Sequence, residues 1–552
     1  MTADLDSRSL PLGRRELATV AALVLLAVLL RLAYTTYPRV VWGDEPFYLW
    51  LGQSLWAGDG YNIFGYSGAH FPPLFPALAG GLGALLGSLQ GASNLLYVLC
   101  GALLVLPVYA MGRHIAGARA AWVAGLFAAL YPALTTGVLA WGTMTEPLYL
   151  LLVAAAIYAL MRGLEWGGTG SYLAMAALLG LAYLTRTEAV VFAALGFLLL
   201  AATRLIRGDR WAGVVGRTVA AGLIFLLVAS PYLLYIHNKT GQWSLTGAAG
   251  MAFVSTEGLA NDDPATFDAA TWGIDPNSGE VYLFAPASEH EGLAASLLAD
   301  PLGLLRRVRA NLRMTLSLLL SAKLVIWPLA ALAALGLFGR PWDGRALRGH
   351  LALIVSLASP LSYVPFFVQD RYLAGMLIPA LVWMGAEAAY LGDWLAGSWS
   401  NLRARPVSPR LATSLDALPA LLVALFLLWS GPRLWSLMQS THSFQPGHLA
   451  AAADLRGRGV TAGDTVMSRY PAIAFHAGAA WAPTPDEAWP TVEAYARLHG
   501  ARYLAMDGWE ASLRPQLSFL VIPGEAPAGL RYLETVEAGP DPVVLYEFEA
   551  TE

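Results

Sequence analysis

The amino-acid sequence predicts a polytopic α-helical membrane protein with about eleven transmembrane helices and a small α/β domain at its C-terminal end. Hydrophobic residues make up 57% of the chain and charged residues only 13%. Apolar runs of about 20 residues, the length that crosses a bilayer as a helix, recur as far as residue 437, and a more polar composition begins near residue 445. The formal net charge of −4 gives no basis for a nucleic-acid partner.

The distribution of arginines predicts how the chain is oriented in the cell membrane. The first apolar run follows Arg14 and Arg15 and ends without a small-residue cleavage site, so we expect it to be a retained helix. Arginines gather in alternate loops, which places those loops and the N-terminus in the cytoplasm and the C-terminal segment outside. The expected helices cover residues 17–36, 93–112, 120–140, 147–162, 171–185, 188–204, 218–236, 314–337, 351–368, 372–392 and 414–437.

We therefore expect two domains. Residues 1–440 form the transmembrane bundle, which carries two long outer loops at 37–92 and 237–313. Aromatic residues among Gly and Pro in the first loop favour short helices at the membrane interface. Residues 441–552 form the extracytoplasmic α/β domain, with expected strands at 464–468, 502–507 and 543–548 and a helix at 492–499.

Charged residues that are far apart in the sequence fall at one predicted membrane boundary, the outer one. Acids and arginines at this depth are costly unless they have a task, and a bundle can gather them around one cavity. They are Asp44 and Glu45 after the first helix, Glu146 at the start of the fourth, Arg186 and Glu188 in the turn between the fifth and sixth, and Asp370 and Arg371 at the start of the tenth.

Each of these residues also has a structural explanation. Asp44 and Glu45 fit solvated loop acids or a helix cap, and Glu146 precedes a proline, as acids at helix N-termini often do. Arg186 and Glu188, in the turn between the fifth and sixth helices, fit an ion pair. Asp370 fits a helix cap, and Arg371 fits a side chain that extends to lipid headgroups.

The residue types suit sugar transfer from a lipid phosphate. A guanidinium binds phosphate through a planar fork, so Arg186, Arg371 and, in an outer basic run, Arg306 and Arg309 are candidate phosphate ligands. A carboxylate can deprotonate an acceptor hydroxyl as it attacks an anomeric carbon, and a neutralised phosphate leaves without a separate general acid. One direct displacement then inverts the sugar carbon. The basic run also fits a solvated helix face or a contact with lipid headgroups.

The order of these motifs resembles the GT-C superfamily of membrane glycosyltransferases. The similarity is closest to the bacterial protein O-mannosyltransferase and aminoarabinose-transferase group, which is like the dolichyl-phosphate-mannose-protein mannosyltransferases. It rests on WGDEP at 42–46, HFPPL at 70–74, TEP at 145–147, RYL at 371–373 and SRYPAIAFHAG at 468–478.

The resemblance implies a sugar donor on polyprenyl phosphate and an extracytoplasmic acceptor, which is a protein, a lipid or a glycan of the cell envelope. It assigns the base to Asp44, with Glu45 beside it, and a second acid to Glu146. Some members hold a divalent metal near the site, and His70, the only histidine of the first loop, is the candidate ligand. No other cofactor is indicated. The candidate substrate-binding residues are Tyr48, His70, Glu188, Asp370 and Tyr372.

Two other classes of membrane protein fit parts of the pattern. A transporter or flippase of a lipid-linked substrate would carry acids or arginines deep within several spans, whereas the helix interiors here are apolar apart from the residues named above. A scaffold that displays residues 445–552 would have no need of Asp44.

Overall fold

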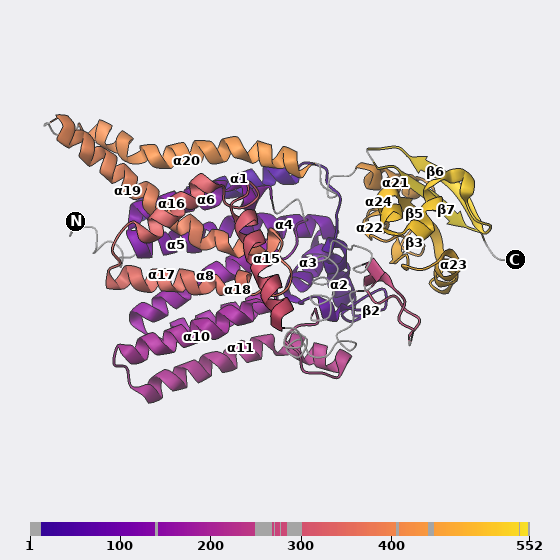
Figure 1. Ribbon diagram of the computed structural model, residues 1–552, viewed down its shortest axis with the longest axis horizontal. Helices are drawn as coiled ribbons and strands as arrows, with labels where there is room; N and C mark the ends of the chain where they lie inside the picture. Colours follow the sequence, from indigo (N-terminus) through magenta and orange to yellow (C-terminus); the bar gives the residue numbers. More distant parts are fainter. Residues whose placement is uncertain are drawn as a thin grey trace.

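The computed structural model describes residues 13–137, 142–248, 268–269, 271–276, 278–283, 301–403, 408–439, 446–539 and 541–549. Long, nearly parallel helices form a bundle over more than half of the molecule, and a smaller sheet domain lies at one end of the bundle (Figure 1).

Seven helical segments in the described part of the chain are long and apolar enough to cross a membrane. Four shorter apolar helices accompany them, at Leu74–Leu86, Ala118–Leu130, Thr169–Tyr183 and Trp327–Phe338. The prediction of a polytopic helical membrane protein is therefore confirmed. The seven segments are Arg14–Thr35, Leu89–Ala116, Glu146–Trp166, Ala189–Ile206, Trp211–Thr240, Arg371–Leu402 and Pro409–Leu437.

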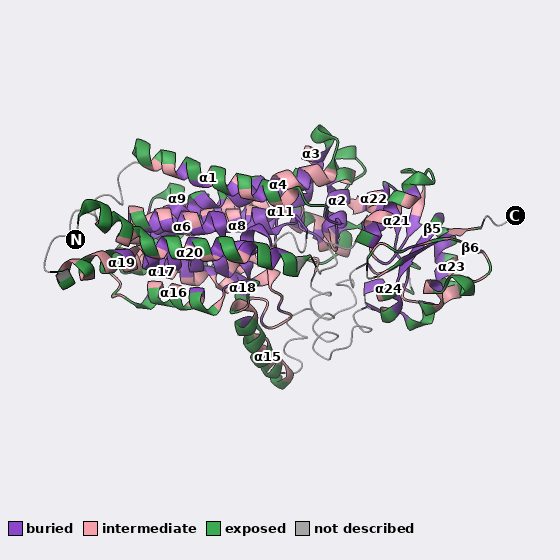
Figure 2. Cartoon of the chain, turned by 90° about the horizontal axis from the view of Figure 1, so that it is seen from above, coloured by how far each residue is buried: buried purple, intermediate pink, exposed green. Residues whose placement is uncertain are grey.

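The packing of the bundle follows the lipid exposure expected of such helices. Glu146–Trp166 lies in the middle and is mostly buried, whereas the first and last long helices expose rows of leucines (Figure 2). In chain order the helices are α1 (Arg14–Thr35), α2 (Glu45–Ala57), α3 (Leu74–Leu86), α4 (Leu89–Leu103), α5 (Val105–Ala116), α6 (Ala118–Leu130), α7 (Pro132–Thr135), α8 (Glu146–Trp166), α9 (Thr169–Tyr183), α10 (Ala189–Ile206), α11 (Trp211–Thr240), α15 (Pro301–Leu319), α16 (Trp327–Phe338), α17 (Gly344–Ser356), α18 (Ala358–Leu361), α19 (Leu377–Arg403) and α20 (Pro409–Met438).

Three of the expected spans are wrong as single helices. The span expected at 120–140 divides into α6 and α7, because Tyr131 is extended and Pro132 opens the next short helix. The span expected at 314–337 divides into α15 and α16, because a polar connection that includes Ser321 and Lys323 separates them and Pro328 opens α16. The span expected at 351–368 ends early, with α17 and the short α18. Pro365 lies in the irregular segment that follows, where it can donate no backbone hydrogen bond.

The two expected outer loops contain more regular structure than loops usually do. Range 37–92 holds α2, α3, a hairpin of β1 (Asn62–Ile63) and β2 (Tyr66–Ser67), and a 3₁₀ turn at Gly68–His70, so the prediction of short helices there is confirmed. In range 237–313, α11 extends to Thr240 and α15 begins at Pro301. Residues 249–267, 270, 277 and 284–300 of this range lie outside the described residues.

The C-terminal part forms a five-stranded mixed sheet in the order β4-β3-β5-β7-β6. β3, β4 and β5 are parallel, and β7 pairs antiparallel with both β5 and β6. The three expected strands and the expected helix are confirmed, whereas β4 and β6 were not predicted. The elements are α21 (Pro446–Gly457), β3 (Thr465–Met467), α22 (Ala472–Ala477), β4 (Ala480–Ala482), α23 (Trp489–Leu498), β5 (Ala501–Asp507), α24 (Gly508–Leu513), 3₁₀ turns at Pro515–Val521 and Pro523–Glu525, β6 (Leu530–Val536) and β7 (Val543–Phe548).

Candidate active site

The segment that leads into α2 is held by the sheet domain. Burial lowers the pKa of His476 to about 4, so its ring is neutral at pH 7, and Nε2 accepts a hydrogen bond from the Val41 N–H at 2.9 Å. Trp42 packs against Tyr470, with ring centroids 4.5 Å apart. Gly43 then turns the chain at φ 62°, a conformation that favours glycine. The fold of the distant sheet domain therefore helps to place Asp44, the N-cap of α2.

A cavity of about 340 Å³ lies beside Asp44. Its walls come from α2, from the 3₁₀ turn after β2, from the turn between α9 and α10, and from the segment around α18 and Arg371. Seven of the twelve predicted site residues take part in the walls, namely Asp44, Tyr48, His70, Arg186, Glu188, Arg371 and Tyr372. The lining residues that carry polar or aromatic groups are Asp44, Tyr48, His70, Thr185, Arg186, Thr187, Glu188, Thr246, Ser362, Tyr363, Phe366, Phe367, Arg371 and Tyr372.

Two arginines and three carboxylates form one connected cluster at this cavity. Arg371 Nη2 lies 3.6 Å from Asp44 Oδ2, and its Nε lies 3.0 Å from Glu146 Oε1. The same Glu146 oxygen accepts a hydrogen bond from Arg186 Nη1 at 2.9 Å, while Arg186 Nε donates to Glu188 at 2.6 Å. Glu146, in the first turn of α8, thus fixes both guanidinium groups although it does not itself line the cavity.

Asp44 is the carboxylate of this cluster that a ligand can reach. Its side chain keeps 34% of its surface exposed, against 7% for Glu146 and 8% for Glu188. Its surroundings are otherwise protein, so burial raises the pKa of the Asp44 carboxyl, and the Glu146 carboxylate adds to the rise while Arg371 opposes it. A carboxylate with a raised pKa is a stronger base than an ordinary aspartate.

Glu45 points away from the cavity. Arg39 Nη1 and Nη2 donate to its two carboxylate oxygens at 2.6 and 2.8 Å, and Thr143 donates from its hydroxyl at 2.8 Å. Burial alone would raise the pKa of Glu45, but Arg39 and the hydrogen bonds from Thr143 lower it. Gly142 is part of this fit, because a Cβ at its φ of 94° would lie 2.3 Å from a Glu45 oxygen. Glu45, for which a catalytic role is predicted, does not line the cavity beside Asp44, and its contacts favour a positioning role.

Three further predicted residues do not line the cavity. Arg306 and Arg309 lie on the exposed surface of α15, and neither has an ion-pair partner within the described ranges. Asp370 accepts a hydrogen bond from the Arg371 N–H at 2.8 Å and pairs with Lys323 at 3.6 Å, which agrees with its interpretation as a cap. Arg371, by contrast, is only 10% exposed and faces the cluster rather than lipid headgroups.

Within the part of the chain that the structure describes, the side chains do not supply a divalent-metal site. The described ranges hold no group of three or more His, Cys, Asp and Glu residues that could bind a metal ion. Arginines already neutralise the cavity carboxylates. Burial lowers the pKa of His70 to about 4, so this residue lines the cavity as a neutral ring. We therefore assign the site no metal-dependent step.

An aromatic wall was missed in the sequence. Tyr363 stacks on Tyr372, with ring centroids 4.4 Å apart at 13°, and its hydroxyl accepts a hydrogen bond from Arg186 Nη2 at 3.0 Å. Phe366 and Phe367 complete this side of the cavity. The run SYVPFF at 362–367, one residue before the QDRY segment, carries the signal, but the membrane helix expected at 351–368 includes it.

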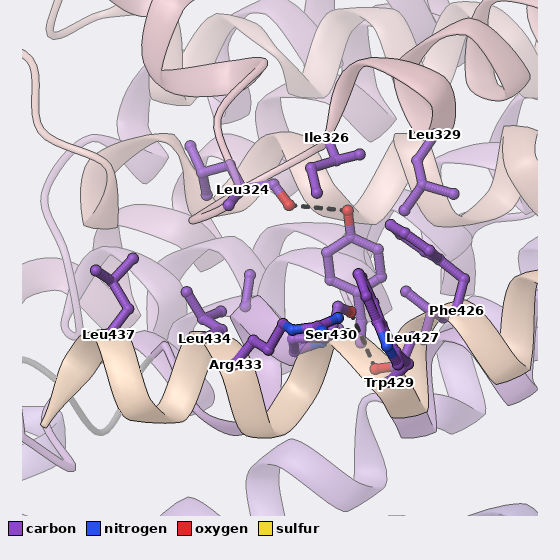
Figure 3. Close-up of a pocket in the computed structure, with 14 residues that line it drawn as sticks. Leu324, Ile326, Leu329, Phe426, Leu427, Trp429, Ser430, Arg433, Leu434 and Leu437 are labelled. Carbon is purple, nitrogen blue, oxygen red and sulfur yellow. Dashed lines mark hydrogen bonds between the residues drawn. The ribbon is translucent and has the colours of Figure 1, made fainter.

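A second cavity, of about 200 Å³, lies between α7, the segment before α16, and α20. Leu324, Ile326 and Leu329 face the side chains of α20 across it (Figure 3). Arg433 is the one charged residue in its lining, and its guanidinium lies over the ring of Trp429. This lining suits hydrocarbon rather than the reacting centre of a polar substrate.

The cavity beside Asp44, which we call the ionised cavity, is lined in part by a segment that matches a known family. Residues 70–235 match the dolichyl-phosphate-mannose-protein mannosyltransferases. The matched range runs from His70 through most of α11 and includes Glu146, Arg186 and Glu188. It confirms the resemblance and the enzyme class predicted from the sequence, a membrane glycosyltransferase of the lipid-phosphate-sugar type. A comparison with curated protein sequences gives no significant match.

Solved structures share the fold over nearly the whole chain. One is the Archaeoglobus fulgidus oligosaccharyltransferase in complex with Zn and sulfate, with TM-score 0.56, 15% identity, and coverage of 95% of this chain and 72% of that one. Another is ArnT from Cupriavidus metallidurans bound to undecaprenyl phosphate, with TM-score 0.52, 12% identity, and coverage of 96% and 97%. At these identities the likeness establishes a common fold, including the sheet domain at the C-terminal end.

Proposed function

We propose that the protein transfers a sugar from a polyprenyl phosphate to an acceptor at the extracytoplasmic membrane face. The observation that carries the proposal is the meeting of an accessible carboxylate, Asp44, with two buried guanidinium groups, Arg186 and Arg371, at one cavity. The shared fold with ArnT, whose structure contains undecaprenyl phosphate, supports the choice of donor lipid.

In the proposed reaction, the acceptor hydroxyl attacks the anomeric carbon of the sugar while the Asp44 carboxylate takes its proton. The new C–O bond forms as the bond between the sugar and the phosphate oxygen breaks, and the electron pair of that bond stays on the polyprenyl phosphate. Attack opposite to the leaving group inverts the anomeric carbon. Arg186 and Arg371 stabilise the negative charge that grows on the leaving phosphate.

The supporting residues have separate roles in this proposal. Glu146 and Glu188 orient the two guanidinium groups, and Glu45 fixes the start of α2 through Arg39. Among the substrate-binding candidates, Tyr48, His70 and Tyr372 line the space next to Asp44, where a sugar ring would lie. Asp370 remains a candidate through its hold on the Arg371 backbone.

We further propose the topology that this reaction requires. About eleven helices cross the membrane within residues 1–440, the N-terminus is cytoplasmic, and residues 441–552 form an extracytoplasmic domain. Cysteine introduced at exposed Ala528 is expected to react with an impermeant thiol reagent outside intact cells, and cysteine at exposed Ser408 only after the membrane is opened. The native Cys100 is buried and gives little background. Labelling of the Ser408 variant from outside would reverse the assigned sides.

A transfer assay tests the activity itself. The purified protein in vesicles receives a radiolabelled polyprenyl-phosphate sugar and a cell-envelope extract as the acceptor, without nucleotide or ion gradient. We expect label to leave the donor lipid and to appear in the extract as a stable glycoside of inverted configuration. If the intact labelled lipid instead moves between the leaflets without transfer, the protein is a transporter of this lipid and the proposal fails.

A further inference from the structure

Helix α15 is placed unlike the helices of the bundle. It runs across the long helices rather than along them, and it projects from the side of the bundle near the end that faces the sheet domain (Figures 1 and 2). Only Thr315 is buried among its 19 residues. A helix in this position has its axis near the membrane plane if the long helices cross the bilayer.

Three arginines of α15 share one stripe of its surface. Arg306, Arg309 and Arg313 are three and four residues apart, which places them on adjacent turns of the same side. All three are exposed, and no carboxylate pairs with them in the described part of the chain. This stripe is a concentration of positive charge on the face where basic residues are usually scarce.

A stripe of exposed leucines lies next to the arginines. Leu305, Leu312 and Leu316 follow helical spacing, and their side chains are 66%, 49% and 57% exposed. The side of the helix that contacts the protein is a third one, marked by the buried Thr315 and by Asn311. An exposed apolar stripe beside an exposed basic stripe is the arrangement of helices that lie in the interface of an anionic membrane.

A specific contact connects α15 to the ionised cavity. The Asn311 side-chain amide donates hydrogen bonds to the backbone oxygens of Val364 at 2.9 Å and Phe366 at 2.8 Å. Phe366 lines the cavity, and Tyr363 beside this segment holds Arg186. The position of α15 at the membrane surface therefore bears on the position of the aromatic wall.

We propose that α15 is a docking surface for anionic phospholipids of the outer leaflet. Arg306, Arg309 and Arg313 bind the headgroup phosphates through their guanidinium forks, while the three leucines insert between the acyl chains. Charge complementarity selects this occupant, because the three guanidinium groups are exposed and no carboxylate among the described residues pairs with them. The proposal differs from a donor-phosphate role for Arg306 and Arg309, and it does not depend on the sugar-transfer activity.

The test measures which lipids gather beside α15 in the full-length protein. A fluorophore is attached to Ser317→Cys, an exposed position on α15, while the buried native Cys100 stays unlabelled. Energy transfer is recorded to acyl-chain-labelled phosphatidylglycerol or, in parallel, phosphatidylcholine, each at trace level in phosphatidylcholine vesicles. We expect stronger transfer to phosphatidylglycerol. Each single replacement of Arg306, Arg309 or Arg313 by Gln is expected to lower the affinity for phosphatidylglycerol, relative to phosphatidylcholine, about fivefold. The triple variant is expected to show no preference between the two lipids.

Arg307→Gln is the matched control, because it removes the same charge from the same helix but from a half-buried side chain outside the basic stripe. It is expected to retain most of the preference. Equal energy transfer to the two lipids in the parent protein would overturn the proposal. The proposal would also fail if Arg307→Gln lost as much of the preference for phosphatidylglycerol as the variants of the basic stripe. A third arm uses labelled polyprenyl phosphate: enrichment of that lipid without enrichment of phosphatidylglycerol would assign the arginines to the donor instead. None of these measurements requires sugar transfer, so their outcome is independent of the proposed function.

Discussion

Two clusters of buried carboxylates and arginines in this protein differ in what surrounds them. At the ionised cavity, Asp44 keeps 34% of its side chain exposed beside Arg371. At the sheet domain, Asp268 is completely covered, and Arg469 Nε and Arg514 Nε each donate to it at 2.8 Å. Arg514 is equally covered. The residue types are the same, but only the first cluster offers a carboxylate to a ligand.

The comparison shows that charge pairing alone does not mark a reactive site. The Asp268 cluster joins the segment before the Ile274–Val281 bridge to the sheet domain, and both ion pairs of Asp268 serve that connection. The Asp44 cluster contains the same kinds of pairs, with Glu146 and Glu188 as the covered partners. The difference lies in the cavity and in the one carboxylate that opens onto it. Changes in the first cluster should therefore affect transfer, and changes in the second should affect stability.

The largest effect on stability is expected from Asp268→Asn. The change leaves two buried guanidinium groups without their charge partner, and loss of one member of a buried ion pair costs about 3–5 kcal/mol. The free energy of unfolding of the full-length protein in detergent micelles, from a urea titration, measures it. Glu534→Ala is the control, since its pair with Arg458 is half exposed and contributes under about 1 kcal/mol. Equal losses of unfolding free energy in the two variants would contradict the structural role assigned to the Asp268 cluster.

A smaller effect, on donor binding, is expected from Arg186→Lys and Arg371→Lys. Lysine keeps the charge but loses the planar fork, so affinity for a polyprenyl phosphate is expected to fall about tenfold, as for one charged hydrogen bond. Binding of a fluorescent polyprenyl phosphate to each variant gives the dissociation constant. Arg306→Lys serves as the control on α15 and should bind like the parent. Parent-like affinity in both cavity variants would show that these arginines only support the fold.

The two clusters are also expected to respond differently to pH. Protonated Asp44 cannot accept a proton, and its pKa is raised, so the transfer rate should rise with pH through a value above the ordinary range of an aspartate. A rate profile that stays flat across that range would contradict a base with a raised pKa.

Glu510 belongs to the second cluster, because it accepts a hydrogen bond from Arg514 Nη1 at 3.2 Å. Burial raises the pKa of Glu510 from 4.5 to about 7, although Arg514 opposes the rise. The folded state then binds more protons than the unfolded state, so this contribution to stability is present below about pH 4.5 and is lost as the pH rises through 7. Unfolding midpoints at several pH values should show this decline, and Glu510→Gln should reduce it. An unchanged decline in the variant would assign it to another group.

Much of the site could be predicted because membrane depth restricts where charged residues can lie. The ends of the apolar runs predict that Glu146, Arg186 and Arg371 lie at one depth, and in the structure the three side chains meet in one cluster. The sequence could not separate Asp44 from Glu45, because consecutive residues at a helix start point in different directions and only the structure shows which one faces a cavity. Arg39, the partner of Glu45, gave no pattern to find.

The differences between sequence and structure have similarly local causes. Arg306 and Arg309 are predicted as ligands of the donor phosphate but do not line the cavity. The rotation and tilt of α15 decide where they point, and these depend on packing such as that of Asn311. The aromatic wall was missed because hydropathy cannot show where a helix ends among large apolar residues. Strand β4 was missed because its three residues are too few to show a periodicity. Strand β6 was missed because a bulge interrupts its alternation.

The most direct test of the account is single-turnover transfer from a defined polyprenyl-phosphate sugar by Asp44→Asn and, in parallel, Glu45→Gln. Asparagine keeps the size and hydrogen bonding of the aspartate but is not a base, so we expect transfer to slow about 10²-fold or more, with donor binding and unfolding close to the parent. Glu45→Gln is expected to lower stability more and the rate less, because its partner Arg39 loses a buried charge pair. Full activity in Asp44→Asn would contradict the account and leave Glu146 as the next candidate for the base.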